Sequence, residues 1–127
     1  MQNTTYSPNH APSNPKKEKT RVQIHQNALL AKIACKILKQ KDVALTLRKT
    51  IYLSDSSPRQ FLQNRRWVAH ELAHVQQFMQ YGTICFIFKY LLESLAKGYY
   101  NNKWEVAARA EEHNLRILDD FIFEYTD

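Results

Sequence analysis

The stretch WVAHELAHVQQFMQYG at residues 67–82 decides how this chain folds, because its apolar residues recur at helical spacing. Upstream, Ser57 is a favourable N-cap and Pro58 suits the first position of a helix. We therefore expect one long helix from Pro58 to Tyr81, which Gly82 ends. Its apolar face is formed by Phe61, Val68, Leu72, Val75 and Met79.

Two histidines on this helix have the spacing that allows them to share a metal ion. Residues 70–74 read His-Glu-Leu-Ala-His, and positions four apart are neighbours on a helix, so His70 and His74 can point at one ion. Glu71 lies about 100° around the helix from His70, where its carboxylate can act as a general base on a water that the metal activates. Two solvated histidines on a polar face are the alternative, but the uninterrupted helix favours a zinc site.

A third protein ligand must come from another part of the chain, since catalytic zinc usually has three protein ligands and one open position. The candidates in the last helix are Glu105, Glu111, Glu112 and His113. Glu111 shares the apolar stripe of that helix, and a solvated acid is the better interpretation of it. Glu105 and Glu112 stack two turns apart on one face, so helical geometry alone leaves both eligible.

The segment before the histidine helix predicts a small β element. Residues 43–53, VALTLRKTIYL, are rich in β-branched residues and partly alternate, which is typical of a strand or a short hairpin around Arg48-Lys49. Residues 24–40 have a helical pattern. Residues 1–20 are polar, contain three of the four prolines and are expected to form a disordered basic tail, with one domain at 21–127.

Two further helices are expected after Gly82. The first covers residues 83–97 and ends at Gly98, and the second covers residues 103–121 after a cap at Asn101 or Asn102. The predicted fold class is therefore mostly α, an α+β helical domain with a small strand or hairpin before the histidine helix.

Composition and charge limit the possible functions. The chain has 127 residues, of which 44% are hydrophobic and 24% charged, as expected for one globular domain. Residues 1–50 carry ten Lys or Arg and two acids, whereas residues 51–127 carry eight and ten, so the net charge of +6 belongs to the N-terminal part. No nucleic-acid-binding signature accompanies this charge, and we expect no nucleic-acid partner.

The cysteines and the apolar runs indicate a reducing compartment. Cys35 and Cys85 both lie in apolar helical surroundings and are expected to be buried free thiols. The N-terminal residues lack the apolar core of a secretory signal. The longest apolar run, residues 84–92, is broken by Lys89 and is too short to span a bilayer. We expect a cytoplasmic protein without a transmembrane segment.

Three stretches of the sequence resemble one known family. HELAHVQQ, the later GYYNNKWEVAARAEE and the preceding VALTLRKTIYLSD are similar to segments of the DUF4157 family of bacterial zincin-like metallopeptidases, over about residues 40–113. Related domains carry the third zinc ligand on the Glu of an Asn-x-x-Glu-x-x-Ala stretch, which corresponds to Glu105. The resemblance thus implies a gluzincin-type site formed by His70, His74, Glu105 and a water.

These residues predict a small zinc-dependent metallopeptidase that acts on a peptide or protein. Glu71 would deprotonate the activated water and later protonate the leaving amine. Side chains that could orient the imidazoles are Gln76, Gln77 and Asn102, and candidate donors to the developing oxyanion are Tyr99, Tyr100, Arg109 and His113.

Two other functions remain open on the sequence. The family resemblance also permits a zincin-like module that binds metal with weak or no turnover, in a secretion or toxin-delivery context. Alternatively, the basic residues of 16–49 could bind nucleic acid or anionic lipid. The sequence does not determine the substrate or the oligomeric state.

Overall fold

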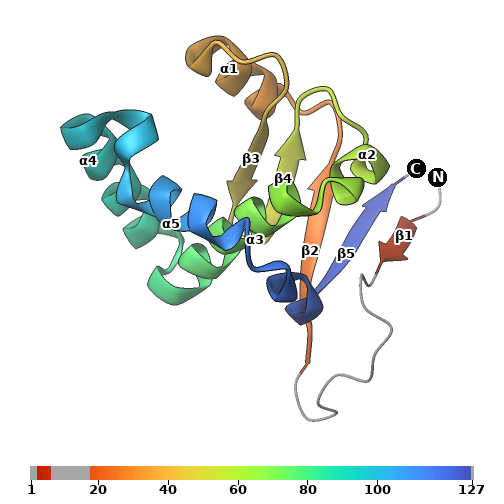
Figure 1. Cartoon of the computed structure of the whole chain (residues 1–127). Coiled ribbons are helices and arrows are strands. Elements are labelled where there is room, and N and C mark those ends of the chain that lie inside the picture. Colours follow the sequence, from red (N-terminus) through yellow and green to blue (C-terminus); the bar gives the residue numbers. More distant parts are fainter. Residues whose placement is uncertain (1–2, 7–17, 127) are drawn as a thin grey trace.

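The computed structural model describes residues 3–6 and 18–126 of the chain, and these residues form an α+β fold. One sheet is built from β1 (Asn3–Tyr6), β2 (Thr20–His25), β3 (Ala44–Leu47), β4 (Thr50–Leu53) and β5 (Phe121–Thr126). The helices are α1 (Leu29–Leu38), α2 (Pro58–Gln63), α3 (Arg65–Tyr81), α4 (Thr83–Asn101), α5 (Lys103–Glu111) and the 3₁₀ helix η1 (Leu115–Asp120). In Figure 1, α3 crosses the front of the sheet.

The sheet has the strand order β1-β5-β2-β4-β3, with parallel pairs at its centre and antiparallel pairs at its edges. Alternate residues of β2 and β5 are buried, as expected for strands with one covered face. These side chains form one core with α3, whose members include Val22, Phe123, Val68, Leu72 and Val75. The helix that carries the histidines is therefore fixed against the sheet.

The predicted hairpin is confirmed as β3 and β4, which pair antiparallel across Arg48 and Lys49. Arg48 has a φ of 59°, in the left-handed region that tight hairpin turns use. The hairpin places β3 at the edge of the sheet next to α3. Thr46 of β3 is consequently buried beside the histidine helix.

The single helix expected from Pro58 to Tyr81 is divided into α2 and α3. Ser57 caps α2 in a reciprocal capping box with Gln60, as its position predicts. Asn64 interrupts the run with a φ of −89° and a ψ of 84°, and its side chain accepts a hydrogen bond from the Trp67 amide. An Asn side chain competes for backbone donors in this way and starts a new helix.

The helix predicted for residues 103–121 is wrong beyond Glu111. The chain continues into η1 and then into β5, whose sequence FIFEYT alternates between buried and half-buried positions. Strand pairing with β2 overrides the helical spacing here. The start of the helix predicted at residue 24 is also wrong, because Thr20–His25 is β2 and the helix begins at Leu29.

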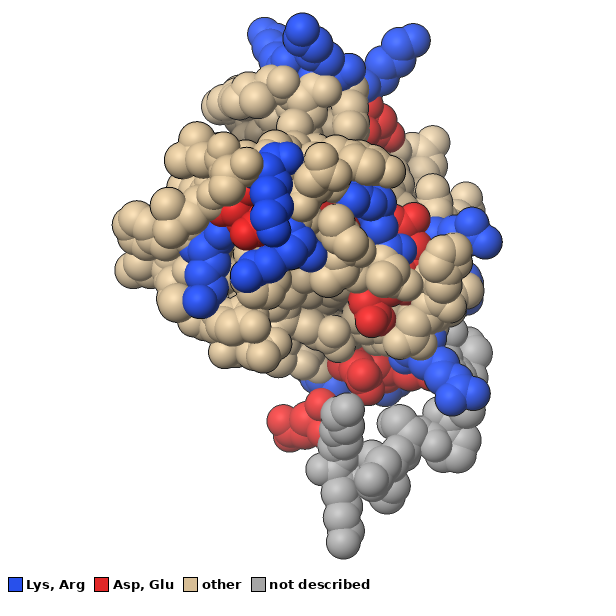
Figure 2. All heavy atoms as spheres, turned by 60° about the vertical axis from the view of Figure 1, so that its left-hand side comes forward, with Lys and Arg blue, Asp and Glu red and all other residues tan. Residues whose placement is uncertain are grey.

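The expectation of a disordered segment over residues 1–20 is wrong for residues 3–6, which form β1 against β5. The main-chain hydrogen bonds that add β1 to the edge of the sheet do not require an apolar pattern in its sequence, so such a pattern could not predict it. Residues 1, 2 and 7–17 lie outside the described residues. Figure 2 shows Lys and Arg side chains at the top of the molecule, where α1 lies. The exposed lysines of α1 are Lys32 and Lys36, and the exposed Lys39 directly follows the helix.

The expectation of buried thiols does not hold: Cys35 is half-buried and Cys85 is exposed, both as free cysteines. Cys85 lies on a face of α4 that the rest of the described chain leaves open. Within residues 3–6 and 18–126, no helix combines the length and apolar character that crossing a bilayer requires.

Candidate metal centre

Two packed helices bring the candidate ligands together. His70 and His74 lie on α3 and Glu105 lies in the first turn of α5, and the two helices are in contact. His70 Nε2 lies 3.1 Å from Glu105 Oε1, and His74 Nε2 lies 3.1 Å from Glu105 Oε2. One ligand atom from each of the three residues can be chosen so that all lie within 4.8 Å of one another.

The charge state of this cluster follows from its burial and its hydrogen bonds. Burial alone would lower the pKa of His70, but its contacts with Glu105 and Glu112 and the charge of Glu71 raise that pKa to about 9. The pKa of His74 is also raised, because Glu105 and Glu71 outweigh its burial. Burial likewise opposes ionisation of Glu105, yet the two imidazoles and Tyr90 hold its pKa well below the usual range.

Each imidazole directs its second nitrogen to a different outer partner. His70 Nδ1 lies 2.8 Å from Glu112 Oε2, and His74 Nδ1 lies 2.9 Å from Gln77 Oε1. Glu112, which helical geometry alone left eligible as the third ligand, thus contacts His70 from the other side of the ring. Such partners fix the ring orientation and the tautomer of a ligating histidine.

Gln77 also connects the two helices, because its Nε2 donates to the main-chain oxygen of Trp104 at 3.1 Å. Of the side chains expected to orient the imidazoles, Gln77 therefore contacts His74 directly. Gln76, by contrast, is exposed.

Asn102 positions Glu105 through the start of α5. It is fully buried, and its Oδ1 accepts a hydrogen bond from the Trp104 amide at 2.8 Å. Its Nδ2 donates to the Tyr90 main-chain oxygen and to Ser94 Oγ on α4. Asn102 thereby holds the first turn of α5 against α4, which fixes the position of Glu105.

Two polar contacts in the site were not predicted from the sequence. Tyr90 OH donates to Glu105 Oε2 at 2.6 Å, and Thr46 Oγ1 donates to Glu71 Oε1 at 2.9 Å. Tyr90 belongs to an apolar helical run and Thr46 to a strand, so local spacing connects neither with the histidines. Only the packing of α4 and β3 against α3 brings them there.

Glu71 is buried between the histidines and β3. Only 5% of its surface is exposed, and burial raises its pKa, although the charges of His74 and His70 and the hydrogen bond from Thr46 act in the opposite direction. A carboxylate in this environment binds a proton more readily than one in water. It is therefore suited to act as a general base.

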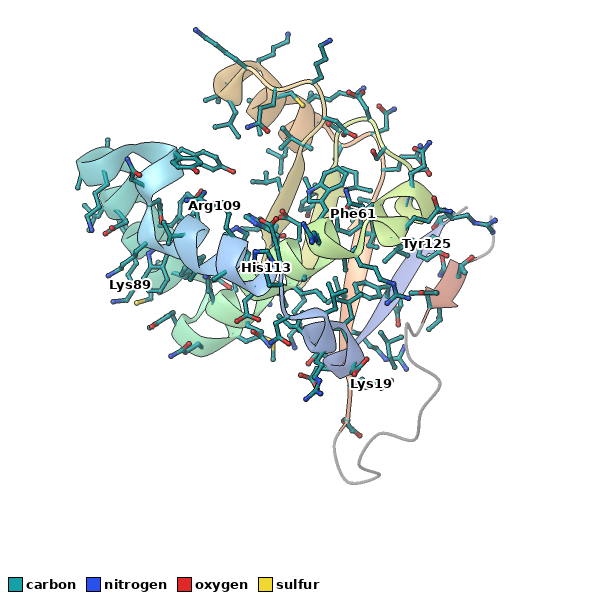
Figure 3. The ribbon with its side chains drawn as sticks, viewed as in Figure 1. Lys19, Phe61, Lys89, Arg109, His113 and Tyr125 are labelled. Atoms are coloured by element: carbon teal, nitrogen blue, oxygen red, sulfur yellow. The ribbon has the colours of Figure 1, made fainter. Side chains whose placement is uncertain are left out.

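A cleft of about 430 Å³ opens beside Glu71 and His70. Its lining includes Tyr99 but none of the other candidate oxyanion donors, Tyr100, Arg109 and His113. The Arg109 guanidinium lies over the Tyr100 ring at 4.1 Å and donates to the Tyr100 main-chain oxygen. His113 follows α5 and is exposed (Figure 3).

Comparison with known proteins places the chain in a family. The model of the eCIS core domain, in which eCIS denotes an extracellular contractile injection system, matches residues 16–82, which is more than half of the chain. Searches of curated proteins and of solved structures returned no match. DUF4157, which the sequence resembles, is a related domain associated with these systems. The matched residues include His70, Glu71 and His74, and the chain belongs to the eCIS core domain family.

Proposed function

We propose that this chain binds one zinc ion through His70, His74 and Glu105 and serves as a metal-binding module of an extracellular contractile injection system. The observation that carries the proposal is the convergence of two imidazole nitrogens on the two oxygens of one carboxylate. Ligands in a tetrahedral zinc site lie about 3.4 Å apart, so the 3.1 Å separations need only a small adjustment. The injection-system context comes from the family.

Glu71 favours a second function at the same site, the hydrolysis of peptide bonds. A zinc ion held there would acidify a water molecule and polarise a carbonyl group. Glu71 is buried beside His70 and His74 and is suited to take a proton from the nucleophile and return it to the leaving amine. The Tyr99 hydroxyl is the candidate donor to the developing oxyanion, because Tyr99 lines the cleft together with His70 and Glu71.

Zinc binding is tested first, by titrating chelator-treated protein with zinc in a calorimeter. We expect one ion per chain, and loss of most of the affinity in Glu105→Ala. Glu111→Ala is the matched control, because Glu111 lies on the same helix but accepts a hydrogen bond from Asn114 outside the site. Equal affinity in the Glu105→Ala and wild-type proteins would contradict the proposed ligand set.

Turnover is tested separately, with a peptide library and mass spectrometry on zinc-loaded protein. Glu71→Gln preserves the shape of the side chain but cannot accept the proton, so this variant should keep its zinc and lose hydrolysis. Zinc binding without hydrolysis that depends on Glu71 would support the metal-binding module alone and reject the peptidase.

A further inference from the structure

One face of α4 is apolar and uncovered by the rest of the described chain. The large side chains on this face are between 52% and 84% exposed, and we call them the α4 stripe: Ile84, Phe88, Leu91, Leu92 and Leu95. The opposite face of α4 packs against the rest of the chain, since Phe86 is buried and Tyr90 contacts Glu105. In Figure 2, which brings this side of the molecule forward, a broad uncharged surface lies beside a group of basic side chains.

The stripe is large enough to form a stable interface. The exposed fractions of its five residues correspond to a surface on the order of 600 Å², which is below the roughly 800 Å² that each partner buries in a standard interface but above the about 500 Å² per partner that a specific interface needs. An apolar patch of this size lies at the upper end of what monomeric proteins leave open to water, and such patches often mark a binding surface. Because the side chains all lie on the part of α4 that precedes the non-helical Gly98, the surface that covers them must follow the length of that part of the helix.

The spacing of the stripe identifies the shape of its partner. Ile84, Phe88, Leu91 and Leu95 follow one another at intervals of four, three and four residues, the spacing of a helix–helix seam. This order reads the same in both directions along the helix. A two-fold axis perpendicular to α4 would therefore place every seam residue opposite another seam residue, as an isologous interface requires.

The charges around the stripe disfavour a membrane. Helices that lie on anionic bilayers carry Lys and Arg along the edges of their apolar face. In α4, Lys97 pairs with Glu93 at 2.9 Å and Lys89 lies over the Tyr81 ring at 5.4 Å, so both are engaged within the chain. Cys85 and Ala96, which are exposed beside the stripe, are uncharged. The stripe therefore fits a second helix whose apolar face also has uncharged residues at this edge.

We propose that the α4 stripe is a homodimer interface in which α4 of a second copy packs antiparallel across a two-fold axis. Ile84 then lies beside Leu95 of the partner subunit, and Phe88 lies beside Leu91 of the partner subunit. The metal-site face of α4 points away from this contact, so both sites stay open. The interface is independent of zinc binding and of hydrolysis.

The oligomeric state tests the proposal directly, by sedimentation velocity of the whole chain at micromolar to tens of micromolar concentration. We expect a dimer for the wild type and a monomer for the double variant Phe88→Lys, Leu95→Lys. The control is Val106→Lys, which changes an exposed apolar residue on α5, outside the stripe. Circular dichroism checks that each variant is folded, which exposed positions favour.

A monomeric wild type at these concentrations overturns the proposal, as does a double variant that remains folded and dimeric. Vesicles of phosphatidylserine and phosphatidylcholine form a further arm of the test. A wild type that is monomeric in solution and binds these vesicles through the stripe assigns this face to a membrane instead.

Cross-linking tests the antiparallel direction of the pair. Cys85 and Ala96 lie on the same flank near opposite ends of the stripe, so the two-fold axis brings each close to the other in the partner. In a Cys35→Ala background, Ala96→Cys should form dimers with a short bismaleimide, whereas Cys85 alone should not. Efficient linkage through Cys85 alone, or none after Ala96→Cys, overturns the antiparallel arrangement.

Discussion

Gln77 and Glu112 each contact one of the two imidazoles on the side that faces away from Glu105: Gln77 contacts His74 and Glu112 contacts His70. Each accepts or shares a hydrogen bond at an Nδ1 atom, which leaves both Nε2 atoms directed at Glu105. Glu112 is an acidic, half-buried side chain, whereas Gln77 is an amide that is buried and connected to the main chain of α5. At the residue scale, the Nδ1 side of the His74 ring is therefore held by a single amide side chain.

The first prediction at this scale concerns that amide. Gln77→Leu keeps the volume of the side chain but removes both hydrogen bonds, so we expect zinc affinity to fall by about 10- to 100-fold. The measurement is competition with a chromophoric chelator. Gln76→Leu, at the exposed neighbouring position, should leave the affinity unchanged. If both variants bind zinc like the wild type, Gln77 contributes only packing.

At the scale of elements, buried or capping asparagines determine where helices begin. Asn64 divides α2 from α3, and Asn102 starts α5 while it is bonded to α4. A kink at Gly98, with a φ of 79°, changes the direction of the chain shortly before this cap. The position of Glu105, the candidate third ligand, therefore depends on the short connection between α4 and α5 that Asn102 holds in place.

This connection yields a prediction for Asn102→Ala. The Trp104 amide loses its partner in a buried place, so the free energy of unfolding should fall by about 1–3 kcal/mol. Zinc affinity should fall as well, because the start of α5 positions Glu105. Urea unfolding and zinc titration measure the two effects. The control is Asn101→Ala, since Asn101 is exposed, and a loss of the same size there would contradict the role of Asn102.

The elements that the sequence predicted correctly are those with local causes. The capping box at Ser57, the hairpin around Arg48 and the end of α3 at Gly82 all follow from residues a few positions apart. β2 and β5 were missed because each is a short strand stabilised by pairing with the other, across about 100 residues of chain.

The same distinction applies to the candidate site. The pairing of His70 with His74 follows from their spacing along one helix. The family resemblance distinguishes Glu105 from Glu112 as the third ligand. The contact between Glu112 and His70 is known only from the structure. Tyr90 and Thr46 reach the site through tertiary packing, for which one sequence contains no local pattern.

At the scale of the whole molecule, the sheet separates the N-terminal strand from the candidate site. β1 lies at one edge and β3, beside Glu71, lies at the other, with three strands between them. Tyr6 of β1 packs against the core, and its ring lies 6.3 Å from that of Phe123. The N-terminal strand thus contributes to the sheet but not to the ligand set.

A chain that begins at Glu18 tests this separation. Without β1 the ladder on β5 and the packing of Tyr6 are lost, so the melting temperature should drop by several degrees. Zinc affinity should equal that of the full chain, as measured by calorimetry. Loss of zinc binding in a truncated chain that remains folded would show that the N-terminal segment acts on the site.

The position of β5 in the sheet has a consequence for how the protein is made. β5 is inserted between β1 and β2, although it follows every other element along the chain. Phe121, Phe123 and Tyr125 supply part of the core, so the core stays incomplete until these residues leave the ribosome. A nascent chain that already contains both histidines and Glu105 still lacks β5, the strand with which β1 pairs in the described part of the chain. We therefore expect folding of this domain to follow its synthesis, because completing the sheet pairs residues more than 100 positions apart.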